Sequence, residues 1–451
     1  MNNDTICALA TATGGALAII RVSGPDAFSI VSSISSVSCE GVTPNTVHYA
    51  HIINGNEIID DVMVSVFHAP RSYTGEDSVE ITCHASSYIC NKVLSLLVEN
   101  GCRTAGPGEY TMRAYLNGKL DLSQAEAVAD LIASTNKASH DIAMSQLRGH
   151  FSSELKTLRD QLLKLTSLLE LELDFSDHED LEFADRMQLL HLAETIDNHI
   201  YRLANSFKAG QALKEGIPVA IVGKTNVGKS TLLNALLKDD RAIVSDIHGT
   251  TRDTIEETMV INGVQFRFID TAGLRKTSDE VEQIGINRTY QAIDKARIVL
   301  WLFDKAPTTE EVTEFTTRSK KRTLIPVLSK IDINEDIPLV SFHASLLKIS
   351  AKTGQGMPEL RQYIFEEAQK AGLIANSTDV IITNARHYEA LTRAHQHLQL
   401  VLDGLQIELS GDLLAEDLKL VLTDLSEITG EGQITSQEIL NNIFSHFCVG
   451  K

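Results

Sequence analysis

The sequence predicts a multidomain α/β protein: a mixed α+β region, then a helical region that is interrupted by an α/β domain with a mostly parallel sheet. Strand-like runs and turn signals alternate over residues 1–118, whereas apolar patterns with helical spacing occupy residues 119–215 and 371–451. Between these two helical stretches, residues 216–370 alternate strand-like runs with helices. Such alternation is typical of a parallel sheet, and helices on both sides of a domain indicate that it is inserted at exposed, adjacent points.

The first region is predicted to be a compact α+β domain. Apolar runs at residues 7–10, 16–22 and 61–67 are typical of strands, and residues 87–97 are typical of a helix. Turn signals separate them at Gly14-Gly15, Ser23-Gly24-Pro25 and Asn54-Gly55.

The helical region begins with a capping box, because Ser123 is followed by Glu126 three residues later. Long apolar patterns then run through residues 147–169 and 183–200. Beyond the inserted domain, three more stripes with helical spacing occur, the last of them after Thr435 and Glu438. The chain ends in Cys448-Val449-Gly450-Lys451.

The inserted domain opens with a P-loop. Residues 223–230 read GKTNVGKS, between the apolar run 219–222 and a helix-like segment. The two glycines of this pattern let consecutive backbone N–H groups point at phosphate oxygens. Lys229 adds a positive charge for the β- and γ-phosphates, and the Ser230 hydroxyl is placed to bind Mg²⁺.

Further loops select the nucleotide. Residues 249–253 (GTTRD) supply a threonine for Mg²⁺, and residues 270–273 (DTAG) end a strand. Residues 329–332 (SKID) and 350–352 (SAK) follow two later strands, and together these motifs resemble the five loops of a Ras-like GTPase. The Asp332 carboxylate can accept from guanine N1–H and the 2-amino group, which adenine does not match. Ser329 stands where such loops usually have asparagine; serine can still bond to a neighbouring loop but loses the amide's second group, and we expect guanine selectivity to survive on Asp332.

The catalytic part departs from Ras. Leu274 follows residues 270–273, where Ras-like proteins have a glutamine that orients the attacking water. Another residue must therefore orient the water, and another positive charge is needed. The Asn226 side chain can hold a monovalent cation beside the phosphates, or it can serve only as a turn residue that tolerates unusual backbone angles.

Composition narrows the class of protein. The chain has 451 residues and a net charge of −20, which disfavours a general electrostatic grip on nucleic acid. RNA contact would need a partner protein or a local basic patch such as residues 318–322, which also fit a solvated helix end. Six cysteines form no zinc or disulfide framework, and no long apolar run or basic leader occurs, so we expect a cytoplasmic protein with reduced thiols.

Several motifs outside the inserted domain complete a family pattern. Residues 74–77 read TGED, 107–109 read PGE, and 119–127 read KLDLSQAEA, and the chain ends in C-V-G-K. Together with the five loops, these motifs resemble the MnmE (TrmE) family of tRNA-modification GTPases over the whole chain.

The resemblance implies an N-terminal domain that binds a formyl-tetrahydrofolate and mediates homodimerisation, a helical domain, and an inserted GTPase domain that is activated by potassium. It also implies a heterotetramer-type complex with the FAD-dependent protein MnmG (GidA). This pair would add an aminomethyl or carboxymethylaminomethyl group to C5 of the wobble uridine, position 34, of certain tRNAs.

The resemblance also implies roles for individual residues. Ser230 and Thr251 fall on Mg²⁺ positions, and Asn226, Ser245, Ile247 and Thr250 fall on positions around K⁺. Glu282 is implied as the catalytic residue that orients water, although Glu282 also fits a charged, ordinary helix start. The implied folate residues are Arg21, Glu80, Lys119 and Lys451. The implied GTP contacts are Asn226, Val227, Gly228, Lys229, Ser230, Thr231, Ser245, Asp246, Ile247, His248, Gly249, Thr250, Thr251, Asp270, Thr271, Ala272, Gly273, Ser329, Lys330, Asp332, Ser350, Ala351 and Lys352.

Alternatives remain open at this point. Cys448 is either a nucleophile whose thiol is activated near Lys451, or a small apolar residue that packs the chain end. A ribosome-assembly GTPase would share the five loops but usually appends a basic RNA-binding domain, which this acidic chain lacks. A regulatory switch without chemistry of its own is the other alternative.

Overall fold

The computed structural model describes residues 4–12, 14–174, 186–238, 257–269, 290–320, 322–333, 346–374, 380–430, 437–445 and 447–450. Contacts divide the chain into two compact units. The N-terminal unit comprises Met1–Ala133, Met144–Ser167 and Leu418–Lys451, and the P-loop unit comprises Ser134–Ala143 and Leu168–Asp417. Among the described helices, none combines the length and apolar character of a membrane span.

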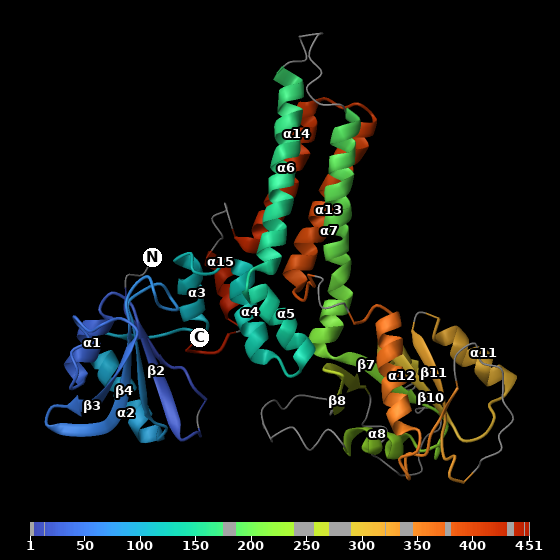
Figure 1. The fold of residues 1–451 in the computed structure, drawn as a ribbon, viewed down its shortest axis with the longest axis horizontal. Helices are drawn as coiled ribbons and strands as arrows, with labels where there is room; N and C mark the ends of the chain where they lie inside the picture. The colour runs from blue at the N-terminus through green and yellow to red at the C-terminus, as the bar shows by residue number, and fades with distance from the viewer. Residues whose placement is uncertain are drawn as a thin grey trace. The chain divides into compact units, whose positions relative to one another are not determined.

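The N-terminal unit is built on a six-stranded sheet of order β3-β4-β5-β2-β1-β6 (Figure 1). Its strands are β1 (Ile6–Leu9), β2 (Leu17–Ser23), β3 (Thr46–Asn54), β4 (Glu57–Phe67), β5 (Ser78–His84) and β6 (Arg103–Thr104). Helices α1 (Ala27–Ile34) and α2 (Ser87–Glu99) bury one face of the sheet, where Ile20, Val64 and Ile81 belong to the core. The predicted α+β region is confirmed, and the Asn54-Gly55 signal marks the hairpin between β3 and β4.

The last described helix packs beside the first helices after the sheet. An apolar cluster joins α3 (Glu109–Leu116), α4 (Leu122–Ala133) and α15 (Gln437–Phe444), through Leu122, Ala125, Leu440, Phe444 and Phe447. The phenylalanines of the last predicted stripe are therefore buried. This packing brings the chain end back to the N-terminal sheet.

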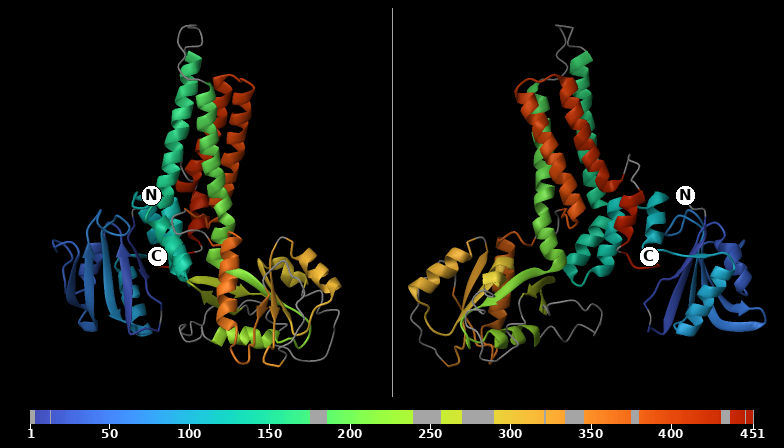
Figure 2. Two further views of the ribbon diagram at one scale, coloured as in Figure 1. Left: turned by 45° about the vertical axis from the view of Figure 1, so that its right-hand side comes forward. Right: turned by 180° about the vertical axis from the view of Figure 1, so that it is seen from behind.

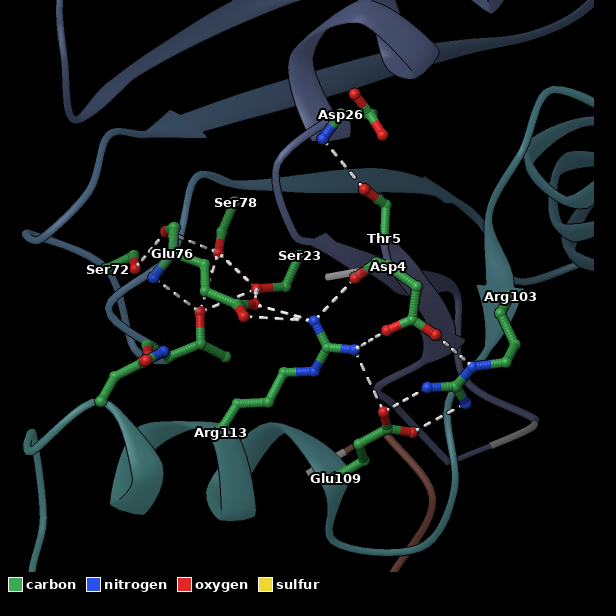
Figure 3. Close-up of polar contacts among 12 residues, drawn as sticks. Asp4, Thr5, Ser23, Asp26, Ser72, Glu76, Ser78, Arg103, Glu109 and Arg113 are labelled. Carbon is green, nitrogen blue, oxygen red and sulfur yellow. Dashed lines mark hydrogen bonds and ion pairs between the residues drawn. The ribbon is translucent and has the colours of Figure 1, made fainter. Parts of the chain in front are cut away.

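A network of charges around the buried Arg113 also joins α3 to the sheet (Figure 3). The Arg113 side chain is only 7% exposed and donates to Asp4 at 2.7 Å, and to Glu76 and Glu109 at 3.2 Å each. Arg103 bonds to Asp4 at 2.6 Å and also pairs with Glu109. The acids of the TGED and PGE motifs therefore hold an arginine that is buried inside the unit.

The long helices differ from the predicted pattern at one point. Apolar spacing ran unbroken from residue 147 to residue 169, but the structure has two helices here, α5 (Lys137–Leu147) and α6 (His150–Asp174). Gly149 separates them with a φ of 80°, a left-handed conformation that ends a helix. Periodicity alone did not show the break because apolar residues continue on both sides of it.

Helices α7 (Arg186–Glu215) and α13 (Ala385–Gln406) lie side by side in the P-loop unit (Figures 1 and 2). Polar bonds add to their packing, since Asp197 on α7 bonds to His395 at 2.6 Å and accepts from Gln399 at 2.7 Å. The remaining long helix, α14 (Gly411–Thr429), buries Leu414, Leu418, Val421, Leu425 and Ile428.

The inserted domain has a six-stranded sheet of order β12-β11-β10-β7-β9-β8, in which only β8 runs antiparallel to its neighbour. Its strands are β7 (Ile217–Val222), β8 (Glu257–Ile261), β9 (Val264–Phe268), β10 (Ile298–Phe303), β11 (Thr323–Leu328) and β12 (Leu347–Lys348). Helices α8 (Lys229–Lys238) and α12 (Met357–Lys370) share one apolar cluster with the sheet. Helix α11 (Thr309–Arg318) packs against a second apolar cluster of the same sheet. The predicted mixed, mostly parallel sheet flanked by helices is confirmed.

The chain enters and leaves this domain at neighbouring points. It enters through Gly216, which directly follows α7, and it returns through residues 380–384. The Ile382 N–H donates to the Ser206 hydroxyl at 3.0 Å. A Cβ on Gly210 would lie 2.0 Å from the Ile382 carbonyl oxygen, so only glycine fits at that helix position. The segment boundaries at residues 118, 215 and 370 stay predictions.

Candidate functional site

The P-loop lies between the end of β7 and the start of α8. Gly223 has a φ of 150°, and a Cβ there would lie 2.2 Å from the Leu302 carbonyl oxygen of β10. Both conformation and close approach therefore require glycine at this position. Gly228 has a φ of 98° with open space around it, so backbone angle alone favours glycine there. The two glycines therefore set the backbone conformation of the loop, and a phosphate would be bound there by backbone N–H groups.

Lys229 is the cation of this loop. Its ammonium donates to the carbonyl oxygens of Gly223 and Lys224, both at 2.7 Å. Burial lowers the pKa of Lys229 from its ordinary value. A phosphate oxygen would offset this cost of burial, because an anion beside the ammonium favours the charged form.

Ser329 links the predicted guanine loop to the P-loop. Its hydroxyl donates to the Val227 carbonyl oxygen at 2.7 Å and lies 3.3 Å from the Phe303 carbonyl oxygen. The side chain is buried, and the bond to Val227 joins the two loops that must hold the base and the phosphates together. Serine therefore makes the bond to a neighbouring loop that the sequence led us to expect.

The rest of the predicted guanine loop lies at the same edge of the sheet, with Lys330 and Ile331 half-buried. Lys330 has a φ of 58°, and its ammonium pairs with Asp304 at 2.9 Å. Asp332 is exposed, so its carboxylate is accessible to a base. The Ile331 N–H donates to the Ile349 carbonyl oxygen at 3.3 Å, which ties this loop to the next one.

The third loop is held from within. Ser350 is fully buried; its N–H donates to the Gln355 carbonyl oxygen at 2.9 Å, and its hydroxyl accepts from the Thr353 N–H at 3.3 Å. Three of the predicted nucleotide loops therefore meet at the carboxyl edge of β7, β11 and β12, where α/β sheets bind ligands.

The structure leaves part of the prediction untested. The residues implied in binding GTP, Mg²⁺ or K⁺ or in positioning water that lie outside the described residues are Ser245, Asp246, Ile247, His248, Gly249, Thr250, Thr251, Asp270, Thr271, Ala272, Gly273 and Glu282. Asn226 is described: it has a φ of 63° and an exposed side chain. That conformation fits a turn residue and leaves its amide accessible, so both readings of Asn226 remain.

A second candidate site lies on the open face of the N-terminal sheet. Arg21 on β2 and Glu80 on β5 are direct cross-strand partners, and the guanidinium bonds to one carboxylate oxygen at 2.7 and 2.9 Å. Both side chains are partly exposed, at 21% and 25%. An ion pair at the surface presents remaining N–H donors and a free carboxylate oxygen to a ligand.

Two tyrosines complete this site, and the sequence analysis missed them. The Arg21 guanidinium lies 5.4 Å from the centre of the Tyr73 ring and 5.5 Å from that of Tyr110. Each tyrosine directly adjoins a motif that was singled out, namely residues 74–77 or 107–109, and this adjacency was the available signal. Lys119 packs beside Gly75, where a Cβ would lie 3.3 Å from the Lys119 Cγ, and its ammonium donates to the Pro70 carbonyl oxygen at 2.9 Å. Among the described residues it makes no bond to Arg21 or Glu80.

The chain end reaches the same site. Val449 forms a β-bridge with Pro107, and the Gly450 carbonyl oxygen accepts from the Arg21 guanidinium at 3.4 Å. Cys448 is exposed, and its carbonyl oxygen accepts from the Gly108 N–H at 3.3 Å. Lys451 lies outside the described residues, so its predicted folate contact is untested, but the residue before it contacts Arg21.

Known protein families match the chain over the residues of both candidate sites. A family model described as GTP-binding protein TrmE N-terminus matches residues 5–119, and one described as MnmE helical domain matches residues 122–448. The proteins named tRNA modification GTPase MnmE in Bacteroides fragilis ATCC 25285 and Flavobacterium johnsoniae are 53% and 50% identical, over the whole of both chains. The solved G domain of the T. maritima FeoB iron transporter matches 34% of this chain and 99% of its own, at 22% identity and a TM-score of 0.25. The matches over the full length show that this chain belongs to the MnmE family of GTPases.

Proposed function

We propose that this GTPase modifies tRNA, adding a carboxymethylaminomethyl or aminomethyl group to C5 of the wobble uridine together with an FAD-dependent partner of the MnmG kind. The observation that carries the proposal is the pairing of two sites in one chain: a P-loop nucleotide site and the Arg21–Glu80 site. Curated relatives of the same full length are named tRNA modification GTPases. The GTP site supplies the switch, and the second site supplies the one-carbon unit.

The one-carbon source is a formyl-tetrahydrofolate at the Arg21–Glu80 site. A pterin ring has N–H donors and ring-nitrogen acceptors, so an ion pair with unused donors and an acceptor oxygen suits it. The aromatic rings of Tyr73 and Tyr110 beside Arg21 add flat apolar surface. Deleting residues 448–451 would remove the Gly450 contact with Arg21 and should weaken folate binding while GTP hydrolysis continues.

Hydrolysis is proposed to need Mg²⁺ and K⁺. Ser230 and Thr251 would hold Mg²⁺, and Asn226, with Ser245, Ile247 and Thr250, would hold K⁺. The ion would supply the positive charge that Ras-like proteins receive from an arginine, and Glu282 would orient the water. The exposed Asn226 side chain in the P-loop fits this role. Asn226→Ala should abolish the preference for K⁺ over Na⁺ and leave GDP affinity nearly unchanged; equal rates in both salts for the wild type would refute the role.

A homodimer through the N-terminal sheet is the proposed assembly. The sheet face opposite α1 and α2 exposes Val47, Tyr49 and Met63, and Tyr49 is 64% exposed directly across from Met63. Leu17 extends the apolar surface on β2, beside the strand positions of Arg21 and Glu80. An apolar patch of this kind marks an interaction surface, and its continuity with the ligand site favours a second copy of the chain.

One experiment tests the proposal as a whole: mass spectrometry of wobble uridines in tRNA from cells that lack this protein. The modified nucleoside should disappear, and it should return with the wild-type gene and not with an Asp332→Asn variant. Normal tRNA in the deletion strain would refute the function and would favour the alternative of a GTPase switch without tRNA chemistry. The cytoplasmic location remains a prediction.

A further inference from the structure

The hairpin formed by β8 and β9 is fastened at its turn to the segment between α4 and α5. The turn is Asn262-Gly263, with φ values of 51° and 82°, which are typical of a type I′ turn. The Ala138 N–H in the first turn of α5 donates to the Gly263 carbonyl oxygen at 3.0 Å. Ala138 and Ile142 also pack against the apolar cluster of the inserted domain. This contact joins residues that are distant in sequence but belong to one compact unit.

Gln265, on β9, accepts the side-chain hydrogen bonds that residues 135 and 136 donate to the hairpin. Its side-chain oxygen accepts from the Thr135 hydroxyl at 2.8 Å and from the Asn136 side-chain N–H at 3.2 Å. The Asn136 side-chain oxygen is already engaged, because it accepts from the Ser139 N–H at 3.0 Å as the cap of α5. The amide nitrogen of Asn136 must therefore face Gln265, so an acceptor is required at that position.

The same glutamine touches the entrance of the inserted domain. A Cβ on Gly216 would lie 3.3 Å from the Gln265 Cγ, so the stem of the glutamine packs against the residue that joins α7 to β7. Gln265 therefore contacts the two parts of the unit that lead out of the domain, one through hydrogen bonds and one through packing.

In the sequence, this hairpin connects two of the predicted nucleotide motifs, residues 249–253 and 270–273. Strand β8 begins at Glu257, directly after the segment that carries Thr250 and Thr251, and β9 leads through Ile269 to Asp270. The two strands are paired over their whole length, from Glu257↔Phe268 to Ile261↔Val264. A paired hairpin is stiff, so fixing its turn also restrains the opposite strand ends, Glu257 and Phe268, about 16 Å along the strand.

We infer that Gln265 is a positioning residue of the GTPase, which fastens the β8–β9 hairpin to residues 135–138 and so fixes the strand ends Glu257 and Phe268 for hydrolysis. It does not contact the nucleotide itself, since the P-loop and the guanine loop lie at the other end of the strands. The inference rests on the GTPase activity of the family and not on the proposed tRNA chemistry.

The test is steady-state GTP hydrolysis by the full chain in K⁺ and Mg²⁺, with GDP affinity measured alongside. Gln265→Met keeps the stem but removes the acceptor, and should lower kcat about fivefold to tenfold while KM for GTP and Kd for GDP stay within about twofold. Gln265→Glu keeps an acceptor oxygen and should retain near wild-type turnover. Asn136→Asp keeps the cap acceptor but loses the donor, and should lower kcat in the same direction.

Controls separate positioning from stability. Gln211→Met changes an exposed glutamine on α7 and should leave turnover unchanged. The double variant Gln265→Met with Asn136→Asp should be little worse than Gln265→Met, because both remove one interaction. Unchanged kcat in Gln265→Met, equal loss in Gln265→Glu, or a rise in KM that matches the fall in kcat would each overturn the inference. These measurements concern GTP turnover alone, so their outcome is independent of the proposed tRNA modification, which the mass spectrometry of wobble uridines tests.

Discussion

In the N-terminal unit, Arg21, Arg103 and Arg113 each face a carboxylate, whereas Lys229 of the P-loop is held by backbone carbonyl oxygens. The arginines are neutralised by side chains that fold brings together. Among the described residues, the Lys229 ammonium bonds to carbonyl oxygens and to no carboxylate, and glycine conformation sets the shape of the loop around it. The difference suits the two proposed ligands, because a polyphosphate needs net positive charge and N–H groups, whereas a folate ring needs paired donors and acceptors. It also indicates that backbone changes should disable one site and side-chain changes the other.

The largest effect is predicted for Gly223→Ala, a backbone change that should disable the P-loop site. A Cβ would lie 2.2 Å from the Leu302 carbonyl oxygen, at a φ that side chains rarely adopt. The loop must then move, and GTP affinity should fall by about a thousandfold, which corresponds to about 4 kcal/mol. Fluorescent GDP titration measures this, with circular dichroism to confirm folding. Affinity near that of the wild type would show that the loop tolerates a Cβ.

The next largest effect is predicted for Arg113→Met in the N-terminal unit. Removing the buried guanidinium leaves Glu76 without its cation, while Glu109 keeps only its pair with Arg103. Breaking a buried pair costs about 3–5 kcal/mol of unfolding free energy. Arg103→Met is the matched control, because the Arg103 side chain is 44% exposed, and it should cost much less. Urea unfolding of the full chain, followed by near-UV signals, should resolve the difference. Equal losses in the two variants would contradict the view that burial makes Arg113 the centre of the network.

A smaller effect is predicted for the dependence of the unfolding free energy on pH. Hydrogen bonding from Arg103 lowers the pKa of Asp4; for Glu109, burial acts to raise the pKa, but bonds from Arg103 and the Gly106 N–H outweigh it and the pKa is lowered. A carboxyl whose pKa falls on folding stabilises the protein above its unfolded pKa of about 4, and this contribution is lost as pH falls through the folded value. The stability difference between wild type and Arg103→Met should therefore shrink below about pH 4. A constant difference down to pH 3 would count against the network.

The smallest effect is predicted for Ser329→Ala. Losing the hydroxyl bond to the Val227 carbonyl oxygen should cost about 1 kcal/mol, or about fivefold in GDP affinity. Ser329→Thr retains a hydroxyl and should bind like the wild type. Isothermal titration with GDP distinguishes these outcomes, and a loss in the threonine variant equal to that in the alanine variant would remove the link between the two loops.

Much of the inserted domain could be predicted because its signals are local. Residues 223–230 carry the P-loop in one stretch, and strand runs with intervening helices indicate a parallel sheet. The N-terminal sheet was also predicted in outline, although β3, β5 and the short β6 were missed. Residues 46–54 of β3 mix histidines and a tyrosine with apolar residues. Gly149 broke a helix pattern that apolar spacing alone made continuous.

The side-chain networks could not be predicted in the same way. Arg113 gathers partners from residues 4, 76 and 109, and Gln265 gathers them from residues 135 and 136. Neither set has a spacing that identifies it, because the contacts exist only after the segments have folded together. Tyr73 and Tyr110 were missed for the same reason: aromatic residues next to a motif are common, and only the guanidinium between their rings gives them a role.

The neighbouring entry and exit of the inserted domain bear on how such a chain arose. With Gly210 against Ile382 and Ser206 bonded to it, the helices on either side meet almost as they would around a tight turn. From the standpoint of the helical chain, a whole nucleotide-binding domain costs little more chain entropy than a short loop, because its two ends are already held together. A gene fusion at that turn would leave the surrounding helices in register from the start, and deletion of the domain with a few glycines in its place should leave them able to fold.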